Sequence, residues 1–158
     1  MSKPVTISPA IIETLYEEAL VLAGASRAAF LRGEDDDDGT PGEISPAACD
    51  RRVAMSCEAL RTTTRMMHAI AWLLNQRAYH SGQITEFQLR RHGRLPPAQP
   101  EGDPRQLAML DGEMRALVDR TRALYARVER LDRAWRARFA MQPSAVHRLR
   151  DRLGTAFG

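Results

Sequence analysis

Residues 45–81 read SPAACDRRVAMSCEALRTTTRMMHAIAWLLNQRAYHS, and this stretch decides the fold. Ser45 followed by Pro46 is typical of a helix start, because serine caps the first turn and proline fits the first helical position. Apolar and small side chains then recur every three or four residues at Val53, Cys57, Leu60, Thr64, Met67, Ala71, Leu74 and Ala78. This spacing predicts one long helix, ending near Ser81, with a heptad-like seam.

A second apolar stripe lies beside the seam, at Ala59, Met66, Ile70 and Leu73. Between Met66 and Leu74 the predicted helix is therefore apolar over most of its circumference. Such a helix must be covered on more than one side. Either it is the central helix of a bundle, or part of it meets another subunit.

Two further segments have the same periodicity. One runs from about Ser8 to Arg32 and repeats the serine-proline start. The other runs from about Asp103 to Met141, and its apolar positions keep a 3.5-residue repeat for four heptads, which is typical of helix bundles and coiled coils. These positions are Leu107, Leu110, Met114, Leu117, Thr121, Leu124, Val128, Leu131 and Trp135.

Loops rich in helix breakers separate the long segments. Residues 33–44 contain five adjacent acids, and residues 93–103 are rich in proline and glycine. A capping-box pattern at Thr85 and Gln88 predicts a short helix before the second loop. We therefore predict an all-α domain over residues 1–142, with three long antiparallel helices in an up-down-up bundle, and a flexible tail over residues 143–158. Helices of this length leave surface to share, which favours a dimer.

Composition restricts the class of protein. The 158 residues are 44% hydrophobic and 27% charged, as in an ordinary globular domain. No window approaches the roughly 18 apolar residues of a membrane span, and the first residues lack the apolar core of a signal peptide. The two cysteines do not make a secreted disulfide framework. These observations predict a cytoplasmic protein with no membrane partner.

No residue pattern predicts catalysis, a cofactor or a metal. Nucleophile-elbow and phosphate-loop motifs are missing, and the four histidines have no metal-ligand spacing. The acidic run fails as a calcium loop, because Ser45 occupies the position that needs glutamate. Cys57 is expected to pack in the core. Six carboxylates fall off the apolar seams and are predicted to be solvated: Glu58, Asp111, Glu113, Asp119, Glu129 and Asp132. We therefore expect no enzyme.

Arginine provides the alternative function. The chain has 23 basic residues, and Lys3 is the only lysine. One basic cluster is Arg90, Arg91, His92 and Arg94, and seven more arginines lie between residues 120 and 138. An arginine-rich helical nucleic-acid-binding protein would bind with an affinity that falls steeply with salt. Acids interleaved with the second group are expected to pair with its arginines, so a nucleic-acid partner is not our first expectation.

Four short stretches carry a family resemblance. They are LYEEAL at residues 15–20, RTTTRMM at 61–67, AWLLNQRA at 71–78 and GQIT at 82–85. Together they resemble the signature of a bacterial family, the regulator of CtrA degradation (RcdA). The resemblance implies a small three-helix homodimer without cofactor or reaction. It would act as an adaptor of the AAA+ protease ClpXP, together with a response-regulator-like protein, and deliver protein substrates in cell-cycle control.

The second apolar stripe is the candidate self-association face, through Met66, Ile70 and Leu73. The alternative is that these side chains pack within one chain. Nearby polar side chains would rim this face or meet a partner: Arg61, Arg65, Asn75 and Gln76. The alternative for these four is intrachain packing or an ordinary solvated position.

Overall fold

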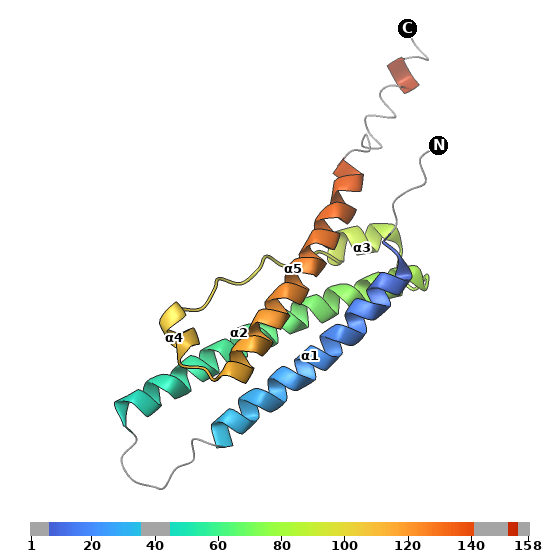
Figure 1. Ribbon diagram of the computed structural model, residues 1–158. Coiled ribbons are helices and arrows are strands. Elements are labelled where there is room, and N and C mark those ends of the chain that lie inside the picture. Colours follow the sequence, from blue (N-terminus) through green and yellow to red (C-terminus); the bar gives the residue numbers. More distant parts are fainter. Residues whose placement is uncertain (1–6, 36–44, 141–151, 155–158) are drawn as a thin grey trace.

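The computed structural model describes residues 7–35, 45–140 and 152–154, and these contain helices and irregular segments but no strand. Three helices are long: α1 (Pro9–Asp35), α2 (Pro46–His80) and α5 (Gly112–Ala140) (Figure 1). Two are short: α3 (Glu86–His92) and α4 (Pro104–Ala108), and residues 152–154 form one further helical turn. The all-α prediction is confirmed. Most of the acidic loop and nearly all of the predicted tail lie outside the described residues.

Local capping explains where the helices begin. The Ser45 hydroxyl accepts a hydrogen bond from the Ala48 amide at 3.2 Å, so α2 starts as predicted. Thr85 and Gln88 form the predicted capping box, in which each side chain accepts from the other residue's backbone amide. This box fixes the start of α3 directly after the turn that ends α2.

The third predicted helix is broken, which corrects the continuous helix expected over residues 103–141. α4 ends at Ala108, and α5 begins at Gly112. The Asp111 carboxylate accepts a hydrogen bond from the Met114 amide at 2.7 Å. Asp111 therefore caps a new helix, because an aspartate before the first turn satisfies an amide that has no partner within the helix.

The direction of α5 corrects the predicted up-down-up order. α1 and α5 are antiparallel, since Arg32 pairs with Glu113 at one end and Glu18 pairs with Arg127 toward the other. Figure 1 shows the same opposed directions in its colours. The salt bridges alone do not place α2, whose direction relative to α5 follows from contacts between those two helices.

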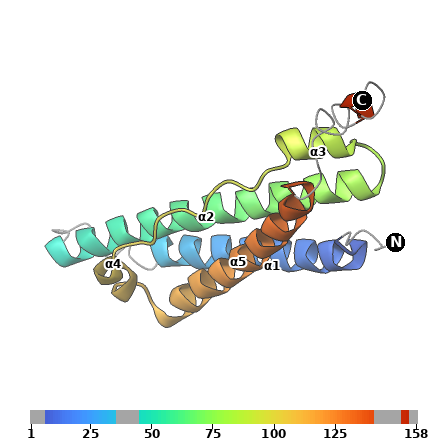
Figure 2. The same ribbon diagram turned by 90° about the horizontal axis from the view of Figure 1, so that it is seen from above.

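α2 and α5 run parallel. Arg65 donates to Thr121 at 2.9 Å, and Trp72 donates to Asp132 at 3.0 Å, so contacts advance along both helices together. The chain returns to the start of α2 through the extended segment 93–103, which runs along α2 in two views (Figures 1 and 2). Its prolines favour an extended backbone of about 3 Å per residue, long enough to span much of a helix.

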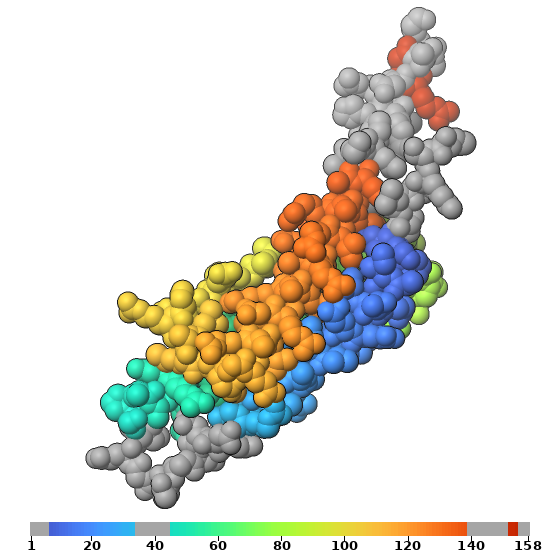
Figure 3. All heavy atoms as spheres, in the orientation of Figure 1, coloured from blue at the N-terminus to red at the C-terminus, as the bar shows by residue number. Residues whose placement is uncertain are grey.

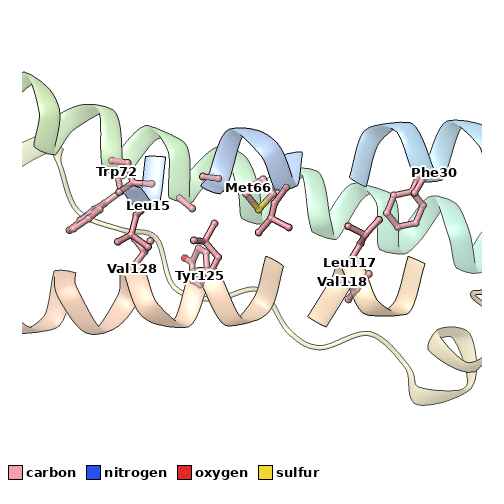
Figure 4. Close-up of a cluster of buried hydrophobic side chains, with 14 of the residues drawn as sticks. Leu15, Phe30, Met66, Trp72, Leu117, Val118, Tyr125 and Val128 are labelled. Atoms are coloured by element: carbon pink, nitrogen blue, oxygen red, sulfur yellow. The ribbon is translucent and has the colours of Figure 1, made fainter. Parts of the chain in front are cut away.

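The core lies where the three long helices meet. α1 contributes Leu15 and Phe30, α2 contributes Met66 and Trp72, and α5 contributes a row that includes Val128 (Figure 4). The seam expected over residues 107–135 is buried as the 3.5-residue repeat predicts, with only Leu107, which lies in α4, and Leu131, which lies in α5, half-buried. α5 lies across α1 and α2 and covers one side of that pair (Figure 3).

Candidate protein-interaction surface

The heptad seam of α2 faces outward. Its four large apolar side chains are 50% exposed at Val53, 69% at Leu60, 64% at Met67 and 43% at Leu74. Each lies two residues, or about 200° of helix rotation, from a position that faces α5 or the core beneath it. The seam is therefore on the side of α2 away from α5. Cys57 is half-buried rather than a core residue, which corrects its expected position.

The exposed face is also uncharged. The seam positions from Val53 to Ala78 include no acidic or basic residue. α1 adds Leu20 and Leu31, which are 46% and 49% exposed and share one face of α1 because eleven residues make about three turns. The exposed apolar side chains along this face of α2, with two more on α1, make this side of the molecule a candidate interaction site. We call Val53, Leu60, Met67 and Leu74 the outer seam.

A groove between α1 and α2 adjoins the outer seam. Its volume is about 350 Å³, and Leu31 and Met67 line it together with side chains of the core. Phe30, Ala59 and Met66 form its apolar walls. The groove is thus continuous with the exposed apolar residues Leu31 and Met67, and small residues such as Ala23 and Ala59 are among those that line it.

The predicted self-association residues occupy a different place. Met66 and Leu73 are only 3% and 0% exposed and belong to the core of the single chain, while Ile70 is half-buried against that core. The intrachain alternative therefore holds for Met66 and Leu73, and this corrects the candidate face. The reason is that α1 and α5 both pack on the stripe, so the neighbouring seam is left uncovered.

Two of the four polar candidates are also internal. Arg65 and Gln76 are buried, whereas Arg61 and Asn75 are half-buried. The amide nitrogen of Gln76 has no hydrogen-bond partner among the described residues. Arg65 and Gln76 therefore do not rim an exposed face, and a contact with a partner remains a prediction for Arg61 and Asn75 alone.

Arg65 belongs to a buried polar cluster between α2 and α5. Its guanidinium lies 3.7 Å from the Glu58 carboxylate and donates to the hydroxyls of Thr62 and Thr121. Burial lowers the pKa of Arg65, and the Glu58 carboxylate opposes that shift. Arg61, which is half-buried, also pairs with Glu58, with 3.7 Å between its Nη1 and Oε2 of the carboxylate. The cluster compensates a buried carboxylate, which would otherwise be very costly.

Glu58 and Asp132 correct the prediction of solvated carboxylates, because both are buried. Asp132 accepts a hydrogen bond from the Trp72 indole and forms an ion pair with Arg136. The seam pattern missed these acids because it follows apolar spacing alone, whereas their partners are polar side chains on another helix or on the same face of their own helix. The i to i+4 spacing of Asp132 and Arg136 was the available signal.

Many arginines are paired, as the interleaved acids predict. Within α5, Arg122 pairs with Asp119, Arg133 with Glu129 and Arg136 with Asp132. Between helices, the pairs are Arg32 with Glu113, Arg77 with Glu13 and Arg127 with Glu18. The basic cluster at residues 90–94 lies on and after α3, with Arg90, Arg91, His92 and Arg94 exposed. The clearest unmatched surface is apolar rather than cationic.

Metal-binding chemistry is not assembled in the part of the chain that the structure describes, where no group of three candidate ligands comes together. Within the same residues, both cysteines are free, with Cys49 exposed. Among the described helices, none combines the length and the apolar character needed to cross a bilayer.

The fold and this surface define an all-helical protein with an uncovered apolar face on its longest helix. The chain belongs to the DUF1465 family, which is described as protein of unknown function, and the family model matches residues 4–157. No curated protein and no solved structure matches the chain.

Proposed function

We propose that the chain is a non-enzymatic adaptor or regulator in ClpXP-dependent proteolysis and cell-cycle control, and that it works as a homodimer. The observation that carries this proposal is the outer seam, because an adaptor acts through contacts with other proteins. The four resembling stretches at residues 15–20, 61–67, 71–78 and 82–85 supply the protease and cell-cycle context.

The outer seam has the length and regularity of a helix-pairing surface. Its four large side chains are seven residues apart, so the seam extends over about 32 Å at 1.5 Å per residue. A seven-residue apolar repeat keeps one face of a helix against a neighbouring helix. Because no seam position is charged, burying the seam against another helix would not bury an unpaired ionic group.

A second copy fits the seam by symmetry. A two-fold axis between Leu60 and Met67 places Leu60 of one chain against Met67 of the second, and Val53 against Leu74. The homodimer proposed here therefore pairs its two α2 helices antiparallel. Leu20 and Leu31 on α1 would flank this contact and widen it.

Cysteine cross-linking tests the pairing. With Cys49 and Cys57 replaced by serine, Leu60→Cys chains mixed with Met67→Cys chains should form a mixed disulfide. Val53→Cys alone should not cross-link with itself. Efficient self-cross-linking of Val53→Cys would indicate parallel helices and overturn the antiparallel dimer.

Binding to the purified unfoldase ClpX tests the adaptor role. The chain should be retained on immobilised ClpX together with a receiver-domain partner, and retention should persist at high salt because the contacts are apolar. The double variant Leu60→Asp and Met67→Asp should weaken retention, while Phe87→Asp serves as a control at an exposed apolar residue on α3. Absence of retention would contradict the proposal. Capture of nucleic acid that is lost at high salt would favour the arginine-rich alternative.

A further inference from the structure

The groove beside the outer seam has the chemistry of a ligand site. We propose that it binds an amphipathic carboxylate, with the aliphatic chain between α1 and α2 and the carboxylate beside Ser26 and Arg27. This inference does not depend on the adaptor role, since it concerns a small molecule and a groove that each single chain possesses. Leu31 and Met67 belong both to the groove and to the proposed dimer contact, so ligand binding and self-association are measured together.

Ser26 supplies the first argument. Its side chain lines the groove, the residue is only 4% exposed, and its Oγ has no hydrogen-bond partner among the described residues. A buried hydroxyl without a partner is destabilising, so such a group calls for an explanation. A ligand oxygen in the groove would accept a hydrogen bond from this hydroxyl. Thr62 is less available, because its hydroxyl already contacts Glu58 and Arg65.

Arg27 supplies the second argument. Among the residues that the structure describes, it is the only charged one that lines the groove, and it is exposed next to Ser26 on α1. No described residue forms an ion pair with it, whereas Arg32 one turn further pairs with Glu113. A single unpaired guanidinium at the edge of an apolar groove selects a ligand with one anionic group.

The walls supply the third argument. Ala23, Phe30, Leu31 and Ala59 present apolar surface, and Met66 and Met67 add flexible side chains that adapt to an aliphatic chain. The volume of about 350 Å³ lies within the range of small-molecule sites. The groove therefore joins apolar walls to the unpartnered hydroxyl of Ser26 and the cation of Arg27, with Thr62 and Thr63 also in its lining, and this is the complement of a fatty-acid-like monocarboxylate.

Calorimetric titration of the full chain with decanoate, below its micelle-forming concentration, tests the site. Decanoate should bind with one molecule per chain. Octanoate should bind roughly tenfold more weakly, since it buries two fewer methylene groups. Decanol should bind more weakly than decanoate, because it leaves Arg27 without a counter-ion.

Variants separate the groove from unspecific binding to the seam. Arg27→Gln should remove the preference for decanoate over decanol, and Ala59→Leu should weaken both ligands by filling the groove. Two controls should bind like the wild type: Arg115→Gln, an exposed arginine on α5, and Leu74→Gln, a seam residue outside the groove. Equal affinity of the wild type for decanoate and decanol would overturn the proposal. A loss of decanoate affinity in Leu74→Gln equal to that in Ala59→Leu would also overturn it. Decanoate binding that disappears as the chain self-associates would assign the groove to a second copy and would overturn it too. An adaptor that binds ClpX but not decanoate would fail this inference alone.

Discussion

Both faces of α2 depart from the usual arrangement of side chains, because charged residues are buried beside core residues such as Met66 and Trp72 while large apolar residues lie outside. The inward face buries Glu58 and Arg65 between α2 and α5, together with Gln76 further along the helix. The outward face exposes Leu60 and Met67, which are 69% and 64% accessible. A helix of a monomeric globular protein normally has charges outside and apolar residues inside.

The apolar repeat of α2 therefore predicts a surface that another surface should cover, but it does not predict whether that other surface belongs to the same chain. The inward polar residues are tolerated because α5 and the segment 93–103 provide their partners or cover them. The outward apolar residues have no such neighbour within the described part of the chain. In the proposed dimer a second copy would cover the outward apolar residues, and burial there would remove their unfavourable contact with water.

The largest expected effect comes from breaking the inward cluster. Arg65→Leu leaves the buried Glu58 carboxylate without its internal partner and should lower the free energy of unfolding by about 3–5 kcal/mol. Urea denaturation measures this change. The double variant Glu58→Leu and Arg65→Leu should recover much of the loss. Arg61→Leu should cost at most about 1 kcal/mol, since that side chain is partly solvated. Equal losses for Arg61→Leu and Arg65→Leu would contradict the described cluster.

The next effect comes from the segment that covers the cluster. A Cβ atom at Gly102 would lie 2.9 Å from Oε2 of Glu58 and 3.0 Å from Nη1 of Arg61. Gly102→Ala should therefore cost about 1–3 kcal/mol through overpacking, as judged from thermal and urea unfolding. Gly112→Ala is the matched control, because its Cβ would meet nothing within 4 Å. Unfolding of both variants at the wild-type temperature and urea concentration would contradict the close packing of Gly102 against Glu58 and Arg61.

A smaller effect is expected at Tyr125, whose hydroxyl donates to the carbonyl of Pro96. Tyr125→Phe removes this hydrogen bond while keeping the ring and should cost about 1 kcal/mol. Hydrogen exchange should accelerate at the amides of segment 93–103 more than in α1. Unchanged exchange in that segment would mean that other contacts hold it against α5.

The smallest effect on the single chain is expected at the outer seam. Leu74→Ser should change the free energy of monomer unfolding by no more than about 0.5 kcal/mol, because the side chain is already substantially exposed. Leu73→Ser, one residue earlier, is the contrast: it should cost several kcal/mol because Leu73 is fully buried. Denaturation at low protein concentration compares the two, and similar losses would contradict the assignment of inner and outer faces.

The sequence predicts the helical class, the limits of α1 and α2 within a few residues, and the buried seam of α5. It also predicts that the helix between Met66 and Leu74 must be covered on more than one side. Periodicity does not predict the direction of α5. The proline-rich segment 93–103 is compatible both with a short loop and with a return along α2, and the structure has the return. The break before α5 had a signal in Asp111, an N-cap residue followed by a new helical turn. Glu58 and Arg65 were misplaced because their buried partners lie on α5 or on α2 itself.

The mass of the chain in solution decides whether the outer seam pairs two copies of the chain. Sedimentation equilibrium of the wild type should show a dimer that dissociates on dilution. The double variant Leu60→Asp and Met67→Asp should be a folded monomer by circular dichroism, because both positions are largely exposed in the single chain. Phe87→Asp should remain dimeric. A wild type that stays monomeric throughout the concentration range, or a double variant that remains dimeric, would contradict the assignment of the outer seam as the self-association surface.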